Sequence, residues 1–344
     1  MVEGQVFRER EETAVHAALR TGAALLDACS PSLPVALYLA PLAGDALVLG
    51  RHQLAQQTLA HGASALRRAT GGNIVRAGSG ILYAALALAD RSSLMACPPG
   101  RLLNRNVRGM LAGLRLAGAK TNYFGRDFLS IGAQPAAYVG WDAAVSGGVL
   151  FEFFVSVTRS CFVPEAELGY PPRVEPALRG QTPTTLQDAG VAPSAEPIFE
   201  HIAAGHAKTF SVTWRAADAA SITPHPGEPP SSEDTAEVRE LVWSSPREEA
   251  IGFVSAGLRL DSAGKVAAVR VAGDFFAHRG CMSTLERVLL GVSPTPELVG
   301  RAVDAAFSHA SYDVEGIRSL RTFQDAIIDA AAAAASVLDD PPQP

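Results

Sequence analysis

The chain has 344 residues, of which 48% are hydrophobic and 19% are charged, and its formal net charge is -6 at pH 7. This length and composition indicate a globular protein with a packed core, and they exclude a disordered or fibrous chain. The acidic balance leaves no basic surplus for binding phosphates over an extended surface, so nucleic acid is not expected as a partner.

The chain carries no targeting or membrane signal that we recognise. No stretch reaches the roughly 18 uncharged apolar residues that a membrane span needs, and the first residues lack the apolar core of a secretory signal. The four cysteines at positions 29, 97, 161 and 281 show no paired spacing typical of zinc sites or disulfide frameworks. We expect a cytoplasmic protein, a monomer, with no metal site built by its own residues and no membrane partner.

Helical and strand patterns alternate in the first part of the chain. Apolar spacing predicts an amphipathic helix over residues 13–29, and residues 35–39 and 46–49 read as the two strands of a hairpin. Further helices are expected over residues 52–63, 102–117 and 194–208, and further strands over residues 65–68, 81–88, 122–131 and 148–157. This pattern indicates a mixed α/β or α+β domain.

The second part of the chain predicts a smaller unit. Residues 216–235 are polar and proline-rich, as in a linker. After them, residues 252–260 and 266–272 predict a β-hairpin, and residues 281–289 and 296–307 predict two helices, which together make a ββαα unit. We therefore expect a first domain at 1–215, a linker at 216–235, a small domain at 236–325 and an alanine-rich helical tail at 326–344.

The most informative segment is LRRATGGNIVRAGSGILY at residues 66–83. Two arginines lead into Thr70, Gly71 and Gly72, where glycines permit a close backbone approach and exposed amides can hold a phosphate or a carboxylate. The alternative is a hairpin turn that uses the glycine pair only for its backbone freedom. Taken alone, the segment leaves both interpretations open.

This segment resembles the arginine, Ser/Thr and glycine-rich signature of the biotin and lipoate ligase superfamily, and in particular of the lipoate-protein ligase A family. Four further segments agree with the family in chain order, so that the resemblance covers residues 35–307. They are LVLGRHQ at 47–53, GRDFLSI at 125–131, SGGVLFEFFV at 146–155 and GKVAAVRVAGDFF at 264–276. The resemblance implies an α+β fold with biotin/lipoate ligase-like mixed sheets flanked by helices, plus a small C-terminal ββαα accessory domain.

Members of that family join an acyl group such as lipoate to AMP and then pass it to a lysine of an acceptor domain. The resemblance implies ATP and Mg²⁺ with lipoate or octanoate, and a lipoyl-type acceptor protein as partner. Adenylation brings a carboxylate against an anionic phosphate, so cations and backbone donors must stabilise the developing charge. By analogy Arg68, Thr70, Gly71 and Gly72 hold the adenylate, and Asp127 lies near the adenine or the metal-bound phosphate.

The chain departs from the family where the chemistry is most demanding. The family's catalytic lysine falls at about Gln134, which carries no charge, and the three lysines of the chain lie elsewhere. The third glycine of the loop is Asn73, and Arg126 replaces the Asn of the family's Asn-Asp pair. Losing one preorganised charge typically costs on the order of a hundred- to thousandfold in turnover, so the catalytic residue stays unknown and the activity is expected to be degenerate.

Two other features offer a replacement. Arg76 and Arg126 are new cations in segments expected to face the pocket, and a guanidinium there would bind a phosphate with two hydrogen bonds; the alternative is that both are ordinary surface residues. Cys161 would serve as an acyl carrier if it were a thiolate, as in related octanoyltransferases. The alternative is a buried structural cysteine.

Three functions follow from these observations. The first is a lipoate-protein ligase-like protein that binds lipoate or octanoate, or its adenylate, and transfers the acyl group to an acceptor lysine. The second is a non-catalytic pseudo-ligase that binds an acyl group or an acceptor domain as a regulator or scaffold, and the third is a cysteine-dependent octanoyl or lipoyl transferase. The candidate site residues are Arg68, Thr70, Gly71, Gly72, Asn73, Arg76, Asp127 and Gln134.

Overall fold

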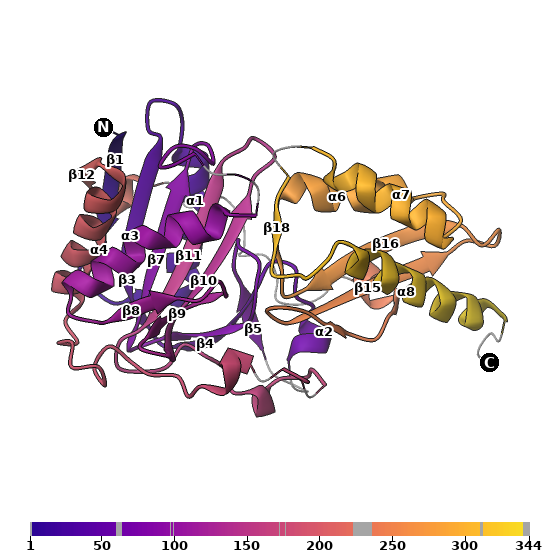
Figure 1. Cartoon of the computed structure of the whole chain (residues 1–344), viewed down its shortest axis with the longest axis horizontal. Helices are drawn as coiled ribbons and strands as arrows, with labels where there is room; N and C mark the ends of the chain where they lie inside the picture. Colours follow the sequence, from indigo (N-terminus) through magenta and orange to yellow (C-terminus); the bar gives the residue numbers. More distant parts are fainter. Residues whose placement is uncertain are drawn as a thin grey trace.

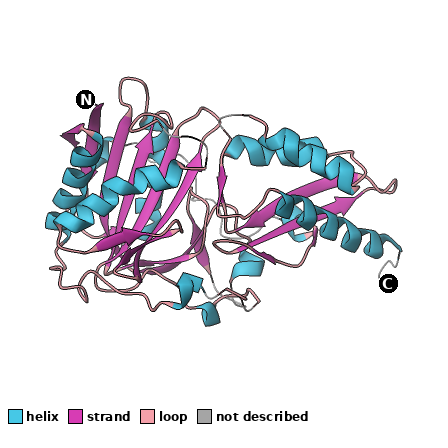
Figure 2. Cartoon of the chain, viewed as in Figure 1, coloured by secondary structure: helices cyan, strands magenta, loops and turns pink. Residues whose placement is uncertain are grey.

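The structure is a computed structural model, and it describes residues 2–59, 64–96, 98, 100–171, 173–175, 177–222, 236–309 and 312–339. Two domains lie side by side (Figure 1): a large domain of residues 2–222, in indigo to salmon, and a small domain of residues 236–339, in orange to yellow. Strands and helices are mixed in both (Figure 2), so the predicted α+β class is confirmed.

The large domain is built around one broad sheet. Among the described residues nine strands form it, in the order β12-β1-β3-β7-β11-β10-β9-β8, with β2 beside β3. Strand β1 pairs in parallel with β3 and β12, whereas the pairs from β3 through β7, β11, β10 and β9 to β8 are antiparallel. The bounds are β1 Val2–Arg8, β2 Thr13–Ala14, β3 Val35–Ala43, β7 Ile81–Leu88, β8 Thr121–Tyr123, β9 Phe128–Ile131, β10 Gln134–Ala143, β11 Val149–Ser156 and β12 Val212–Ala217.

Helices cover both faces of this sheet, which explains why β7 and β11 are buried at every position. Helix α1 (Val15–Ala28) packs on one face, and α3 (Leu102–Leu116) and α4 (Ala195–Phe210) pack on the other. Side chains alternate between the faces with a period of two. In β3, Val35, Leu37 and Leu39 join the core under α3 and α4, and the residues between them join the core under α1.

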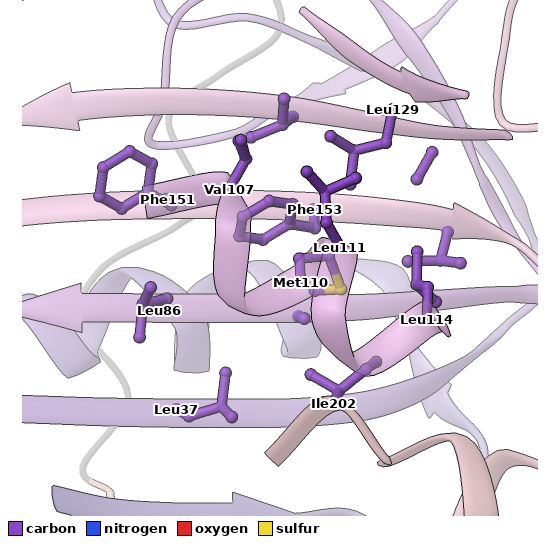
Figure 3. Packing of buried hydrophobic residues seen from close by; sticks show 14 of the residues in the cluster. Leu37, Leu86, Val107, Met110, Leu111, Leu114, Leu129, Phe151, Phe153 and Ile202 are labelled. Atoms are coloured by element: carbon purple, nitrogen blue, oxygen red, sulfur yellow. The ribbon is translucent and has the colours of Figure 1, made fainter. Parts of the chain in front are cut away.

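The core under α3 is dense (Figure 3). Side chains of α3, among them Val107 and Met110, lie over strand residues such as Phe153, and Ile202 of α4 closes the cluster. Each such side chain contributes roughly 1.5–3 kcal/mol when fully buried. The two helices approach closely because Gly113 of α3 and Gly205 of α4 face each other, so that a methyl group at Gly205 would overlap the backbone of Gly113.

A second, three-stranded sheet stands apart, in the order β5-β4-β6. Its strands are β4 Asp45–Leu49, β5 Ala65–Arg67 and β6 Val75–Gly78. The predicted pairing of residues 35–39 with 46–49 is wrong, because β3 pairs with β1 and β7 while β4 turns away at Gly44 into this second sheet. The connection from β5 to β6, residues 68–74, is called the glycine loop here. Of the predicted 52–63 helix, only α2 (Ala55–Thr58) is helical among the described residues. Residues 52–54 and Leu59 are not helical, and residues 60–63 lie outside the described residues.

Three short 3-10 helices complete the large domain: η1 Glu165–Glu167, η2 Ala177–Gly180 and η3 Ala219–Ser221. Ala219 and Ile222, which fall within the predicted linker, pack in the core under α1. Residues 223–235 of the predicted linker lie outside the described residues.

The small domain contains the predicted hairpin, β15 with β16, followed by α6 and α7. The segment expected to be an alanine-rich helical tail is helical up to Asp339, as the end of α8, and its Ala326, Ile327, Ala330 and Ala331 are buried in the core of the small domain. Its elements are α5 Ala236–Arg239, β13 Val242–Trp243, β14 Arg247–Glu248, β15 Phe253–Leu260, β16 Val266–Gly273, β17 Phe276–Ala277, α6 Arg279–Leu289, α7 Pro296–Phe307, β18 Val314–Glu315 and α8 Arg321–Asp339.

Buried polar and apolar contacts join the two domains. Phe276 and Ile251 of the small domain belong to the core cluster of the large one. Arg279 lies 2.6 Å from the fully buried carboxylate of Asp142 on β10. Within the described residues no helix has both the length and the apolar character needed to cross a membrane.

Two substitutions that shorten side chains on α8 test whether this helix belongs to the core of the small domain. We expect Ile327→Ala to lower the free energy of unfolding by roughly 2–5 kcal/mol, because it leaves a cavity in the core. Val337→Ala on the same helix, where the side chain is 49% exposed, should change it by less than about 0.5 kcal/mol. Urea unfolding measures both values, and equal effects would mean that α8 is a peripheral tail.

Candidate functional site

A cavity of about 540 Å³ lies where the large domain meets the small one. The large domain contributes the end of the glycine loop, the two residues before β9, Tyr138 of β10 and residues between 162 and 180, and the small domain contributes three side chains. The lining residues are Asn73, Ile74, Arg126, Asp127, Tyr138, Phe162, Val163, Pro164, Glu165, Ala166, Leu168, Tyr170, Pro171, Arg173, Leu178, Gly180, Ile251, Phe253 and Asp274. Most of this wall is apolar, with a few charged groups set into it.

Two arginines give the cavity its positive charge. Arg173 is held by the small domain, because it donates to the carbonyl oxygens of Ile251 at 3.2 Å and Glu249 at 3.3 Å. The Nε atoms of both arginines are buried and have no hydrogen-bond partner among the described residues, but Arg173 Nε lies 3.7 Å from the Glu248 carboxylate, whereas no ion pair of Arg126 is found among these residues. Burial lowers the pKa of Arg126 and the Asp127 carboxylate opposes this effect. An anion bound in the cavity would therefore balance the positive charge of Arg126, which its protein neighbours compensate only in part.

Two buried carboxyl groups also line the cavity. Asp127 accepts a hydrogen bond from Asn73 Nδ2 at 2.7 Å, and burial raises its pKa. Asp274 accepts from the Phe253 amide at 2.7 Å, from Gln53 Nε2 and from the Tyr170 hydroxyl, and burial raises its pKa to about 6. Both groups already have protein partners and would repel a bound anion.

Arg68, which the sequence analysis predicts to hold the adenylate, lies inside the fold and away from the cavity. Its side chain is only 1% exposed and does not line the cavity. The guanidinium donates to the Thr70 hydroxyl, to the carbonyl oxygens of Val48, Gly71 and Asn73, and to the Tyr138 hydroxyl at 2.6 Å. Its donors are therefore used to fold the glycine loop.

The backbone amides of Thr70, Gly71 and Gly72, which the sequence analysis predicts to hold the adenylate, also have protein partners. They donate to Glu152 Oε2 at 2.9 Å, to the Trp141 carbonyl at 3.2 Å and to the Phe275 carbonyl at 3.0 Å, respectively. Gly72 has a φ of +89°, and a methyl group on it would overlap the Tyr138 hydroxyl and the Phe276 ring. The glycines serve close packing against the small domain.

The remaining predicted residues divide into two groups. Asn73, Arg126 and Asp127 come together on the cavity wall. Arg76 points elsewhere, into ion pairs with Glu167 and with Asp45 at 3.6 Å, and Gln134 is exposed, with its Nε2 3.4 Å from the Thr182 carbonyl. The three lysines of the chain, Lys120, Lys208 and Lys265, are exposed and none lines the cavity.

Cys161 is a structural residue, which argues against the cysteine-dependent transferase. It is fully buried in the core under α1, and its thiol donates to the Phe154 carbonyl at 3.2 Å. Burial raises the pKa of the thiol to about 11, so the nucleophilic thiolate is disfavoured.

Sequence reasoning missed several lining residues. They include Tyr170, Arg173 and Asp274. The signal that was available is the lone carboxylate of Asp274 within an apolar run, because a buried acid requires partners.

The pKa of Asp274 predicts a pH dependence of stability. Because the folded state holds this proton more tightly than the unfolded chain does, the contribution of Asp274 is complete at low pH and is lost as the pH rises from about 4 through about 6. Asp274→Asn should reduce this decline by on the order of 1–3 kcal/mol, since one pKa unit is worth about 1.4 kcal/mol. Unfolding in urea at pH 4.5 and 7.5 measures the difference, and an unchanged pH slope would contradict it.

A second pair of variants tests the packing of the glycine loop. Gly72→Ala and Gly44→Ala both place a side chain at positive φ, but nothing lies within 4 Å of the added methyl group at Gly44. Gly72→Ala should therefore lose about 1–3 kcal/mol more unfolding free energy than Gly44→Ala, owing to overpacking. Equal losses of unfolding free energy in the two variants would show that the small domain does not pack tightly against the glycine loop.

No model of a known protein family matches the sequence, and no curated protein matches it. Among solved structures, P. falciparum LipL1 in complex with lipoate aligns over 98% of this chain and 99% of its own, with a TM-score of 0.66 and 11% identity. A bi-partite lipoate protein ligase from Thermoplasma acidophilum aligns over 63% of this chain and 88% of its own, with a TM-score of 0.50 and 15% identity. The chain therefore has the fold of lipoate-protein ligases.

Proposed function

We propose that this chain binds lipoate or octanoate, or the corresponding acyl-adenylate, in the interdomain cavity and transfers the acyl group to a lysine of a lipoyl-type acceptor protein. The observation that carries this proposal is an apolar cavity with two cations: Arg173 is held by the carbonyl oxygens of Ile251 and Glu249. Arg126 has a buried Nε without a hydrogen-bond partner among the described residues. The volume of about 540 Å³ lies within the roughly 300–1,000 Å³ typical of small-molecule sites.

The charges in the wall orient such a ligand. The carboxylate or phosphate would lie toward Arg126, because the carboxyl groups of Asp127 and Asp274 disfavour an anion at their own positions. The acyl chain would contact the apolar residues Phe162 and Leu168, where each buried CH₂ contributes about 0.8 kcal/mol. P. falciparum LipL1, which shares the fold over almost its whole length, was solved with lipoate, and this is in keeping with the assignment.

The described residues do not build a cage of their own for Mg²⁺. The described residues include no group of three or more His, Cys, Asp or Glu side chains able to hold a metal ion. Of the three carboxyl groups on the cavity wall, Asp127 accepts from Asn73, Asp274 accepts three hydrogen bonds and Glu165 is exposed. Arg126 is thus the group of this chain that would stabilise negative charge during transfer.

A second candidate function is a non-catalytic pseudo-ligase that binds the acyl group or the acceptor as a regulator or scaffold. The observation that favours it is the absence of lysine from the cavity wall, since all three lysines are exposed. An arginine stays protonated and cannot exchange a proton in a reaction. Mass spectrometry of an acceptor protein after incubation with an acyl donor separates the two candidates, because only the first increases the acceptor mass.

Arg126→Ala should weaken binding of a non-hydrolysable octanoyl-adenylate analogue about 10- to 100-fold, because a charge-assisted hydrogen bond is worth about 1.5–3 kcal/mol. Arg215→Ala, an arginine on β12 with a 69% exposed side chain, is the matched control and should bind like the parent chain. Isothermal titration calorimetry measures the affinities. If no variant, parent included, binds the acid or the analogue, the proposed function is wrong.

A further inference from the structure

We propose that this chain receives its acyl group already activated, as an acyl-adenylate, and does not itself activate the free acid with ATP. This inference rests on the proposed function and names the donor for it. The class of reaction that must supply the donor is an ATP-dependent joining of a carboxylic acid to AMP with release of pyrophosphate, carried out elsewhere.

The first argument is the use of the backbone donors. A triphosphate is held by several amides that point at it, commonly from a glycine-rich loop. Here the amides of Thr70, Gly71 and Gly72 all donate to protein oxygen atoms, on Glu152, Trp141 and Phe275.

The second argument is space. The Phe275 carbonyl lies so close to Gly71, and the Phe276 ring so close to Gly72, that either glycine has no room for even one added carbon atom. Phe276 is itself 1% exposed and packs on Trp141, with ring centroids 6.1 Å apart. The side of the loop that would face a triphosphate is therefore filled by the small domain.

These contacts are anchored at several further points. The ion pairs Arg279–Asp142, at 2.6 Å, and Arg91–Asp313, at 3.0 Å, cross the same domain boundary, and each buries its carboxylate almost completely. Separating a buried carboxylate from its partner is costly, because the carboxylate is left as an uncompensated buried charge. The glycine loop is thus closed by the fold and not by one mobile side chain.

The third argument concerns charge. Cleavage of a triphosphate needs cations that neutralise several phosphates, usually a metal ion and a lysine. Neither a metal-binding cluster within the described residues nor a lysine is present at the cavity, and Arg68 is fully engaged. Of the two arginines at the cavity, Arg173 already donates to the carbonyl oxygens of Ile251 and Glu249. Arg126 remains, and one guanidinium matches one phosphate.

An acyl-adenylate fits that arrangement. Its single phosphate is bonded directly to the acyl carbonyl, so a cation on the wall of an acyl cavity meets it. In the transfer step the amine of the acceptor lysine attacks the carbonyl carbon, a C–N amide bond forms and the C–O bond to the phosphate breaks. AMP leaves with the bonding electron pair, and the amine releases a proton to solvent.

The experiment supplies the full-length chain and a lipoyl-type acceptor with one of three donors: synthetic octanoyl-AMP, octanoate with ATP and Mg²⁺, or octanoyl-CoA. Intact-mass spectrometry measures octanoylation of the acceptor, and the rate without the chain is subtracted because acyl-adenylates react slowly with amines. Pyrophosphate release is measured in parallel. We expect octanoyl-AMP to react at least a hundredfold faster than the acid with ATP, with no pyrophosphate above background.

Variants connect the rate to the cavity. Arg126→Ala should slow transfer from octanoyl-AMP at least tenfold, whereas the exposed control Arg215→Ala should retain the parent rate. A rate that is insensitive to Arg126→Ala would overturn the assignment of the phosphate site.

The remaining outcomes are distinct. Pyrophosphate release or acceptor octanoylation from octanoate and ATP at a rate near that of octanoyl-AMP overturns the inference but leaves the proposed function standing. Transfer from octanoyl-CoA alone overturns the choice of donor. Binding of the adenylate analogue without transfer from any donor overturns the inference in favour of the non-catalytic candidate.

Discussion

The buried guanidinium of Arg68 is the constraint on which the rest of this structure depends. A buried cation must satisfy all its donors, and Arg68 does so with the Thr70 hydroxyl, the Tyr138 hydroxyl and three carbonyl groups of β4 and the glycine loop. These bonds set the path of the loop, which turns its amides toward protein acceptors and leaves Asn73 at the cavity. The same path lets Phe275 and Phe276 of the small domain close over the two glycines.

The cavity and the closed loop are consequences of one domain arrangement. When the segment from Gly273 to Ala277 crosses the boundary, it places Asp274 on the cavity wall and the two phenylalanines against the loop. The small domain therefore lines the apolar cavity with one side of this segment. With the other side it covers the glycine loop, where the sequence analysis predicts the phosphate of the adenylate. A chain with the lipoate-protein ligase fold can in this way keep room for an acyl group while its own residues leave no donor for a triphosphate.

The sequence was sufficient for the α+β class, for most helices and for a hairpin followed by two helices, because these follow from local periodicity. The sequence was not sufficient where a residue or strand distant in the chain determines the local structure. Residue types alone place Arg68 at a phosphate, but Tyr138, seventy residues away, is what turns it inward. The sequence of β4 predicts a hairpin with β3, but the antiparallel neighbour of β3 in the structure is β7. The alanines of α8 are buried against β15. Their hydrophobicity differs too little from one face of the helix to the other for the sequence to predict this burial.

The central claim is that the cavity binds an acyl-adenylate while the glycine loop stays closed. A crystal structure of the full chain with a non-hydrolysable octanoyl-adenylate analogue tests this most directly. The account predicts the octanoyl chain among the apolar residues of the cavity, the phosphate mimic within hydrogen-bond distance of Arg126, and the Gly72 amide still bonded to the Phe275 carbonyl. A phosphate mimic bound to the amides of Gly71 and Gly72, with Phe275 and Phe276 displaced, would contradict it.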